Sequence, residues 1–189
     1  MNVKFSTKFV AASAAAVMAL SLAGCSGGSM DDSSSSSAKA SGDSITIGTV
    51  TTNSGTAAAY GEAEVKGFEL AVSEINAKGG INGKKVKLES MDDKGDATEA
   101  SNAFNKLAGD NSVLGVVGPT ISSTTAAVAP LADQSKLPAI APAATSDSIE
   151  TGGYMFRTCF KDSYQGEIAA KYAAETLKVK NCLLYTSPS

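Results

Sequence analysis

The fold is constrained most by a regular alternation between β-branched runs and helical apolar spacing across residues 45–177. Ile45–Thr51 reads ITIGTVT, a run bounded by small polar residues that predicts a buried strand. Apolar residues then recur at helical spacing from Val65 to Ile75, and glycines at 79, 80 and 83 predict a stop and a turn. In all, strands are expected at 45–51, 85–91, 113–117 and 138–141, and helices at 65–75, 97–107, 123–134 and 162–177.

This order predicts right-handed crossovers and therefore an α/β fold, with a parallel sheet covered by helices on both faces. Ligands of such sheets bind beyond the carboxyl ends of the strands, where loops lead into helices. Three segments follow predicted strands: 51–60, 118–125 and 141–147. We expect all three to meet at one edge of the sheet.

Two of these segments carry hydroxyl groups. An apolar run ends at Gly118-Pro119 and is followed by four consecutive hydroxyl side chains from Ser122 to Thr125. Ser122 and Ser123 fall where a helix should begin, and free N–H groups and hydroxyls there suit a carboxylate. Serine is equally favoured as an ordinary helix N-cap, so both interpretations stay open. In 142–146, a backbone carbonyl and a threonine hydroxyl could receive an ammonium group, or the loop could simply cap a turn.

The N-terminal segment predicts export. Lys4 and Lys8 form a short basic region before an apolar run at 9–22 that is too short to span a bilayer, which takes roughly 20 residues. This layout is typical of a secretory signal. The following Leu-Ala-Gly-Cys, ending at Cys25, resembles the lipobox of bacterial lipoproteins, in which the cysteine is acylated and becomes the first mature residue. The alternative is a membrane-anchored helix with an incidental cysteine.

We therefore expect a lipoprotein signal peptide at 1–24 and lipidation at Cys25, followed by a Ser-rich flexible tether at 25–43. The protein would be extracytoplasmic and held to the bacterial cell membrane by its lipid. At the other end, residues 182–189 read CLLYTSPS, which resembles a translated sequencing-library adapter. We interpret them as an artefact, and the chain as an N-terminal fragment; a genuine short apolar tail is the alternative.

Composition excludes several classes of function. The chain has 16 basic and 19 acidic residues, and loss of the leader with its two lysines leaves 14 against 19, or −5, which argues against a nucleic-acid partner. There is no histidine and no Cys-x-x-Cys pair, so we expect no zinc, no cofactor and no Cys–His catalysis. Asp92-Asp93 could suggest acid–base catalysis or a metal, but we interpret the pair as ending a strand and capping a turn. Cys159 is expected to be a small buried residue.

A family resemblance rests on longer motifs. The stretch AAAYGEAEVKGFELAVSEINAKGGINGKKVKLESMDDKGD resembles the N-terminal lobe of branched-chain amino acid binding proteins of ABC importers. VVGPTISSTT, PAIAPAATS and MFRTCFKDSYQG continue the resemblance in the same order, so that it covers nearly all of residues 45–180. It implies a Rossmann-like parallel-sheet lobe of the type I periplasmic binding protein fold. The ligand-binding lobe would occupy residues 44–181, and the second lobe of the full-length protein would be missing.

The resemblance also implies a ligand site. Ser122 would bind the ligand carboxylate, together with the neighbouring amide of Ser123. Ala143, through its carbonyl, and Thr145 would make further contacts, and Tyr60 would wall the side-chain end of the cleft. From the residues alone, Tyr60 could instead be a staple for the helix that follows it.

The implied function is that of a solute-binding lipoprotein, not an enzyme. It would bind leucine, isoleucine, valine or a similar amino acid between two closing lobes and deliver it to ABC permease subunits. A ligand-sensing receptor of the same fold is the alternative. A nucleotide enzyme would need G-x-G-x-x-G after the first strand, and TTNSGTAAAYG lacks that spacing.

Overall fold

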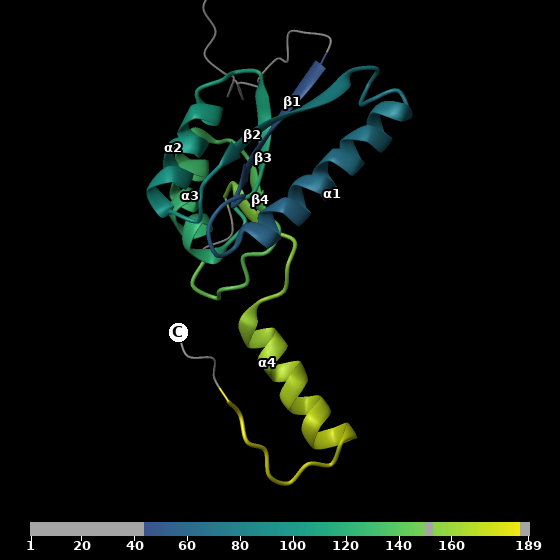
Figure 1. The fold of residues 1–189 in the computed structure, drawn as a ribbon, viewed down its shortest axis with the longest axis vertical. Helices are drawn as coiled ribbons and strands as arrows, with labels where there is room; N and C mark the ends of the chain where they lie inside the picture. Colours follow the sequence, from purple (N-terminus) through teal and green to yellow (C-terminus); the bar gives the residue numbers. More distant parts are fainter. Residues whose placement is uncertain (1–43, 150–152, 186–189) are drawn as a thin grey trace, which may run out of the picture. The chain divides into compact units, whose positions relative to one another are not determined.

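The computed structural model describes residues 44–149 and 153–185, and it confirms the predicted α/β class. Five strands form one parallel sheet in the order β2-β1-β3-β4-β5 (Figure 1). The strands are β1 (Ser44–Thr51), β2 (Lys85–Asp92), β3 (Val113–Val117), β4 (Ala139–Ala141) and β5 (Met155–Arg157). The helices are α1 (Ala58–Ala77), α2 (Ala97–Ala108), α3 (Ser122–Ser135) and α4 (Asp162–Lys171), and α4 continues into a short π-helical segment, η1 (Tyr172–Thr176).

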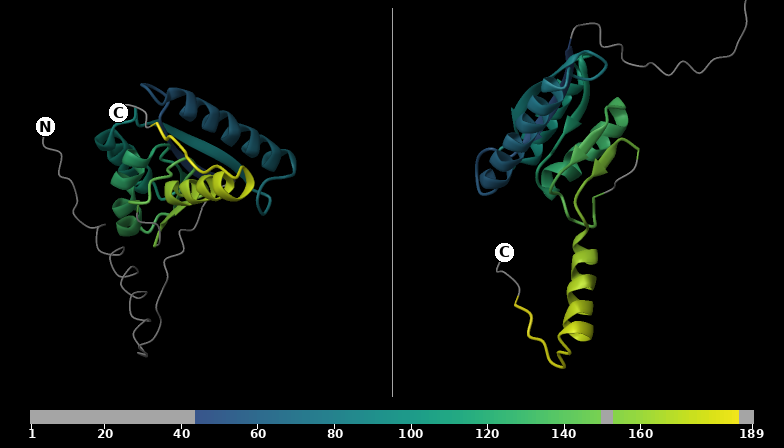
Figure 2. Two further views of the ribbon diagram at one scale, coloured as in Figure 1. Left: turned by 90° about the horizontal axis from the view of Figure 1, so that it is seen from below. Right: turned by 90° about the vertical axis from the view of Figure 1, so that its right-hand side faces the viewer.

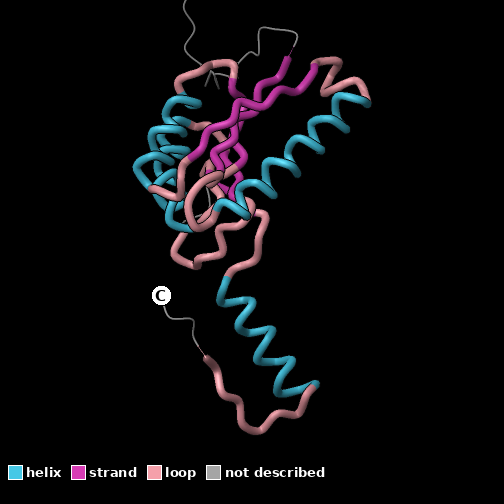
Figure 3. Tube along the Cα trace, in the orientation of Figure 1, coloured by secondary structure: helices cyan, strands magenta, loops and turns pink. Residues whose placement is uncertain are grey.

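The strand register places the predicted loops at one edge. β1 and β2 pair along their whole length, so that Thr51 lies opposite Asp92, and Val117 at the end of β3 lies opposite Thr49. Because all strands run in the same direction, the segments that follow β1, β2, β3 and β4 all leave the sheet at its carboxyl edge. Figure 3 shows these loops gathered below the strands.

The core lies between the sheet and the helix pair α2–α3. These two helices pack against each other; α2 contacts β1, β2 and β3, and α3 contacts β4 and β5. Their buried side chains follow the predicted helical spacing, and Phe104, Leu107 and Val128 are fully enclosed together with Val50 and Met155. Burial of such large apolar groups is the main favourable term in folding, which fixes the sheet and these helices as one unit.

The opposite face of the sheet is covered less than the sequence predicts. α1 lies on this side and contacts only β1 and β2 among the strands (Figures 1 and 2). Its one buried residue is Gly61, and Leu70 in the predicted apolar stripe is 62% exposed. Ile140 and Phe156 are paired neighbours on β4 and β5, and both are exposed. The expectation of helices over both faces is therefore met only over β1 and β2 on this side of the described chain.

The turn between α1 and β2 forms as predicted. α1 ends at Ala77, and Gly79, Gly80, Asn82 and Gly83 all adopt positive φ, which glycine and asparagine tolerate best. A Cβ on Gly80 would lie 2.0 Å from a backbone oxygen across the turn, so that position needs glycine for space as well.

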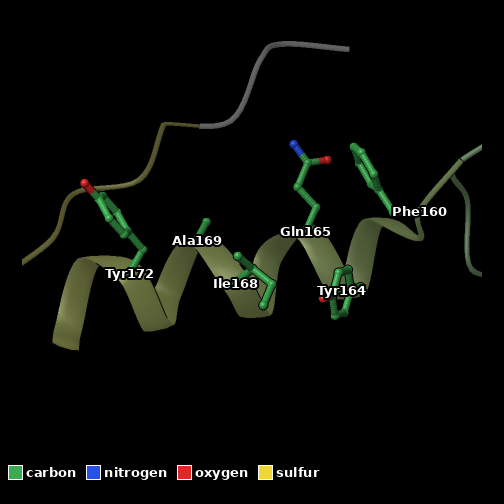
Figure 4. A pocket seen from close by; sticks show the side chains of 6 residues that line it. All are labelled: Phe160, Tyr164, Gln165, Ile168, Ala169 and Tyr172. Carbon is green, nitrogen blue, oxygen red and sulfur yellow. The ribbon is translucent and has the colours of Figure 1, made fainter. Parts of the chain in front are cut away.

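Helix α4 has no buried residue, and among the described helices and strands it contacts only η1. Exposed aromatic and aliphatic side chains recur every four residues from just before α4 to the start of η1: Phe160, Tyr164, Ile168 and Tyr172 (Figure 4). At its N-terminus the Asp162 amide donates to the carbonyl of Thr145 over 3.0 Å. The prediction that residues 44–181 form a single lobe is not tested by this arrangement and stays a prediction.

The predicted signal peptide, the tether and Cys25 lie outside the described residues, as do the last four residues of the proposed artefact. Residues 182–185 are exposed and belong to no helix or strand. Within the described ranges, no helix is both long and apolar enough to cross a membrane.

Candidate ligand-binding site

Hydrogen bonds join the loops at the carboxyl edge of the sheet. The Thr52 amide after β1 donates to Thr120 Oγ1 after β3 over 3.0 Å. The Ser146 amide after β4 donates to Ser122 Oγ at the start of α3 over 3.2 Å. The predicted meeting of the three loops at one edge is therefore confirmed.

The start of α3 decides how the hydroxyl cluster is used. The helix begins at Ser122, its N-cap is Ile121, and no side chain caps it. Thr124 and Thr125 turn their hydroxyls back onto the carbonyl of Ile121, over 3.0 Å and 2.8 Å. These two threonines are thus satisfied locally, whereas Ser122 and Ser123 are not part of a cap. The interpretation of Ser122 as an ordinary N-cap is wrong.

Ser122 is left with a hydroxyl proton to donate. Its oxygen accepts the Ser146 amide, and its own proton has no acceptor among the described residues. The first backbone amide after the cap that bonds within the helix is that of Thr125, which donates to Ile121. The amides of Ser122 and Ser123 are consequently free, and together with the hydroxyl proton they form a set of donors at the positive end of a helix dipole. Such a set is suited to an anion.

The loop after β4 carries the next two predicted contacts. Ala143 and Thr145 are both partly exposed, and the Thr145 hydroxyl makes no hydrogen bond to the described residues. Asp147 accepts the hydroxyl and the amide of Ser163 over 2.7 Å and 3.0 Å, and these bonds lower the pKa of its carboxyl. The loop is therefore tied to the start of α4 and leaves Thr145 open.

Arg157 fixes this loop from β5, and sequence reasoning missed it. One guanidinium nitrogen donates to the carbonyls of Ala144 and Ser146 over 3.1 Å and 2.9 Å, and the other donates to Ile149 over 2.9 Å. Guanidinium presents several donors in a rigid plane, which lets one side chain bind three carbonyls of a single loop. The available signal was that Arg157 is the only arginine in the chain.

A concave site of about 500 Å³ lies beside these loops. It is lined by Ala59, Tyr60, Ala63, Glu64, Pro142 and Ala143. Tyr60 is 65% exposed, so it is not buried as a helix staple would be. The structure thus brings Tyr60 and Ala143 to one cavity, while Ser122, Ser123 and Thr145 lie outside its lining. A second cavity, of about 460 Å³, is lined by residues of α4, by Phe160 two residues before it and by Tyr172 at the start of η1, with Gln165 its only polar side chain apart from the tyrosine hydroxyls (Figure 4).

The acidic pair Asp92-Asp93 ends β2 and holds the turn that follows it, as predicted. Asp93 is fully buried and accepts the Thr52 hydroxyl over 2.6 Å and the Gly95 amide over 2.9 Å. Partial burial acts to raise the pKa of Asp92, but hydrogen bonds from the amides of Lys94 and Asn53 outweigh it and lower that pKa. In the described part of the chain, no three acidic, histidine or cysteine residues gather as a metal site would require. Cys159 is only partly buried, not enclosed as expected, because it follows β5 in an exposed loop.

Comparison with known proteins agrees with this geometry. The family model described as "Periplasmic binding protein" matches residues 44–189. The chain belongs to the periplasmic binding protein family. The Leu/Ile/Val-binding protein BraC3 of Rhizobium johnstonii is 39% identical over 138 residues, which cover 72% of this chain and 37% of that protein. The Leu/Ile/Val-binding protein of Escherichia coli K12 is 38% identical over 136 residues, covering 71% and 37%.

Solved structures of the same kind match this periplasmic binding protein. The branched-chain amino acid transporter substrate-binding protein LivJ of Streptococcus pneumoniae, in complex with isoleucine, superposes with a TM-score of 0.66 at 43% identity, covering 71% of this chain and 39% of that one. The substrate-binding protein of Desulfitobacterium hafniense in complex with leucine gives 0.64 at 30% identity, covering 70% and 39%. The chain spans less than two fifths of the length of these relatives.

Proposed function

We propose that this chain is the N-terminal part of an extracytoplasmic solute-binding lipoprotein of an ABC importer. The protein would bind leucine, isoleucine, valine or a similar amino acid and deliver it to the permease subunits. The observation that carries the proposal is the start of α3, where Ser122 and two free amides present donors at the carboxyl edge of the sheet. Similarity to Leu/Ile/Val-binding proteins supports the choice of ligand.

In the proposed complex, the ligand carboxylate accepts hydrogen bonds from the Ser122 hydroxyl and from the amides of Ser122 and Ser123. The ammonium group donates to the carbonyl of Ala143 and to the Thr145 hydroxyl, which both lie in the loop held by Arg157. The apolar side chain rests against Tyr60. Each polar group of an amino acid thereby meets a group of the opposite hydrogen-bonding character.

The proposed mechanism is binding and release without chemistry. A second lobe, supplied by the rest of the full-length protein, closes over the ligand by a hinge motion. The predicted lipid on Cys25 would keep the protein near its permease, and the Ser-rich tether would let it search the membrane surface. Neither catalytic groups nor a cofactor enter this cycle.

Ser122→Ala combined with Thr145→Ala in the full-length protein tests the proposal. Calorimetric titration with leucine, isoleucine and valine should show binding by the parent and none by the double variant. Melting temperatures should fall only slightly, since Ser122→Ala removes the acceptor of one amide, that of partly exposed Ser146, which water can replace, and neither hydroxyl donates a hydrogen bond within the described fold. Ser135→Ala is the matched control, because its hydroxyl bonds only to carbonyls of α3 at the far end of that helix. A parent protein that binds no amino acid would refute the proposed ligand class.

A further inference from the structure

Glu64 lies in the wall of the candidate site, although no sequence motif marks it. It follows Tyr60 by four residues on α1, which places both side chains on the same helix face. Both line the 500 Å³ cavity, and Ala143 lines it from the loop after β4. Glu64 is therefore the one acidic side chain in the lining of this cavity.

Only one of its carboxylate oxygens is held by the protein. Oε2 accepts the Thr120 hydroxyl over 2.7 Å, and Thr120 in turn accepts the Thr52 amide over 3.0 Å. Because the Thr120 hydroxyl has a single proton, this chain of bonds fixes the direction of donation towards Glu64. The other oxygen, Oε1, is buried and has no hydrogen-bond partner in the described part of the chain.

This arrangement is energetically costly unless a donor arrives. Burial raises the pKa of Glu64, the Thr120 hydrogen bond acts in the opposite direction, and the negative charge of buried Asp93 raises it further. A buried carboxylate oxygen without a partner bears a desolvation cost that a hydrogen bond would recover. The terminal torsion of glutamate is broad, so a modest rotation can turn the free oxygen towards the cavity.

We propose that Glu64 is a ligand-contacting residue, whose free carboxylate oxygen accepts a hydrogen bond from a donor on the bound amino acid. The donor is either the ammonium group, which every amino acid carries, or a hydroxyl or amide on the ligand side chain. The first case adds an anionic partner for the ammonium within this lobe. The second case extends the ligand class to polar amino acids such as threonine. The inference rests on the proposed amino-acid-binding function.

Glu64→Gln in the full-length protein tests the contact, because glutamine keeps the size of the side chain and removes its charge. Glu62→Gln is the matched control, since Glu62 lies on the same helix, is exposed and does not line the cavity. Leucine and threonine are titrated into each protein by calorimetry. We expect the Glu64 variant to bind at least about tenfold more weakly, and the Glu62 variant to match the parent.

The pattern of loss identifies the donor. Equal loss for leucine and threonine indicates the ammonium group, and loss for threonine alone indicates a side-chain donor. Affinities within twofold of the parent for both ligands overturn the inference and leave the proposed function standing. A parent that binds neither ligand refutes the proposed function, and this inference with it. If the glutamine variant does not fold, Glu64→Asp is used instead, because it keeps the charge but moves it back by the length of one methylene group. Unchanged affinity of that variant for both ligands would then contradict the inference.

Discussion

Arg157→Met should loosen the loop that carries Ala143 and Thr145. Methionine keeps much of the apolar stem of arginine but removes the guanidinium group. The variant therefore loses three hydrogen bonds, to the carbonyls of Ala144, Ser146 and Ile149. Ala144 is fully buried, so water reaches that part of the loop poorly.

The expected cost follows from these bonds. A hydrogen bond to a charged group contributes about 1.5 kcal/mol or more when it is buried, which would give at least about 4.5 kcal/mol for three. Arg157 is itself only partly buried, and water can replace some of the lost donors at the exposed carbonyls. We therefore expect a decrease of about 3 kcal/mol in the free energy of unfolding, on the same scale of hydrogen-bond energies. The free energy of unfolding of Arg157→Lys should lie between those of the parent and of Arg157→Met, because an ammonium group cannot bond to three carbonyls as a planar guanidinium does.

Urea unfolding followed by circular dichroism, together with leucine titration of the full-length protein, measures both consequences. Leucine affinity should fall by about tenfold or more, since each 1.4 kcal/mol spent on ordering the loop costs a factor of ten. Lys171→Met is the control: it also removes one positive charge, but from an exposed pair with Glu167 that should contribute well under about 1 kcal/mol. Stability within about 0.5 kcal/mol of the parent, with unchanged affinity, would refute the role given to Arg157.

Four further changes test the fold around the site. Gly118→Ala should cost about 3 kcal/mol or more in thermal melts, since φ is +121° and the new Cβ would lie 2.0 Å from a carbonyl oxygen of β1. Gly67→Ala in the open middle of α1 should instead stabilise by about 0.5 kcal/mol. Asp96→Ala removes the N-cap of α2. Hydrogen bonds from the Glu99 and Thr98 amides lower the pKa of Asp96 below 3.8. The parent should therefore be more stable than the variant above pH 3.8, and this difference should vanish as the pH falls through the lowered pKa. Glu64→Gln should show the opposite pH dependence, because the pKa of Glu64 is raised above 4.5. The contribution of Glu64 to stability is complete below pH 4.5 and is lost as the pH rises through the raised pKa. The melting temperature of the variant relative to the parent should therefore rise with pH.

Much of the lobe could be predicted because its signals are local. Apolar spacing and glycine positions define each element within a short window, and β1, β2, α2 and β3 all lie within one or two residues of the predicted bounds. α1 begins at Ala58, well before its first predicted apolar residue, because the alanines at its start carry little periodicity. The uncovered part of the sheet could not be predicted from the sequence. The apolar stripe of α1 indicates that the helix packs against another element, but it does not identify which strands that element contains.

The contacts of the site depend instead on residues that are far apart in the chain. Glu64 and Thr120 are 56 positions apart, and their contact depends on the pairing of β1 with β3, which fixes where the loop after β3 leaves the sheet. No local pattern carries that information. The same holds for Arg157, whose three acceptors come from a loop that has no regular structure of its own.

The hydroxyl cluster shows how a one-residue difference in a helix start changes the chemistry. A helix that began at Ser123 would make Ser122 the N-cap, and the serine oxygen would then accept a bond from its own helix. The helix begins at Ser122 instead, and the serine oxygen accepts the amide of Ser146 from the neighbouring loop. Its proton and the first helical amides are thereby left as donors, while Thr124 and Thr125 use their protons on the carbonyl of Ile121. Of four chemically similar hydroxyl residues, the fold therefore leaves the serine pair with unused donors, which the proposed binding of a carboxylate requires, and uses the threonine pair to hold the turn.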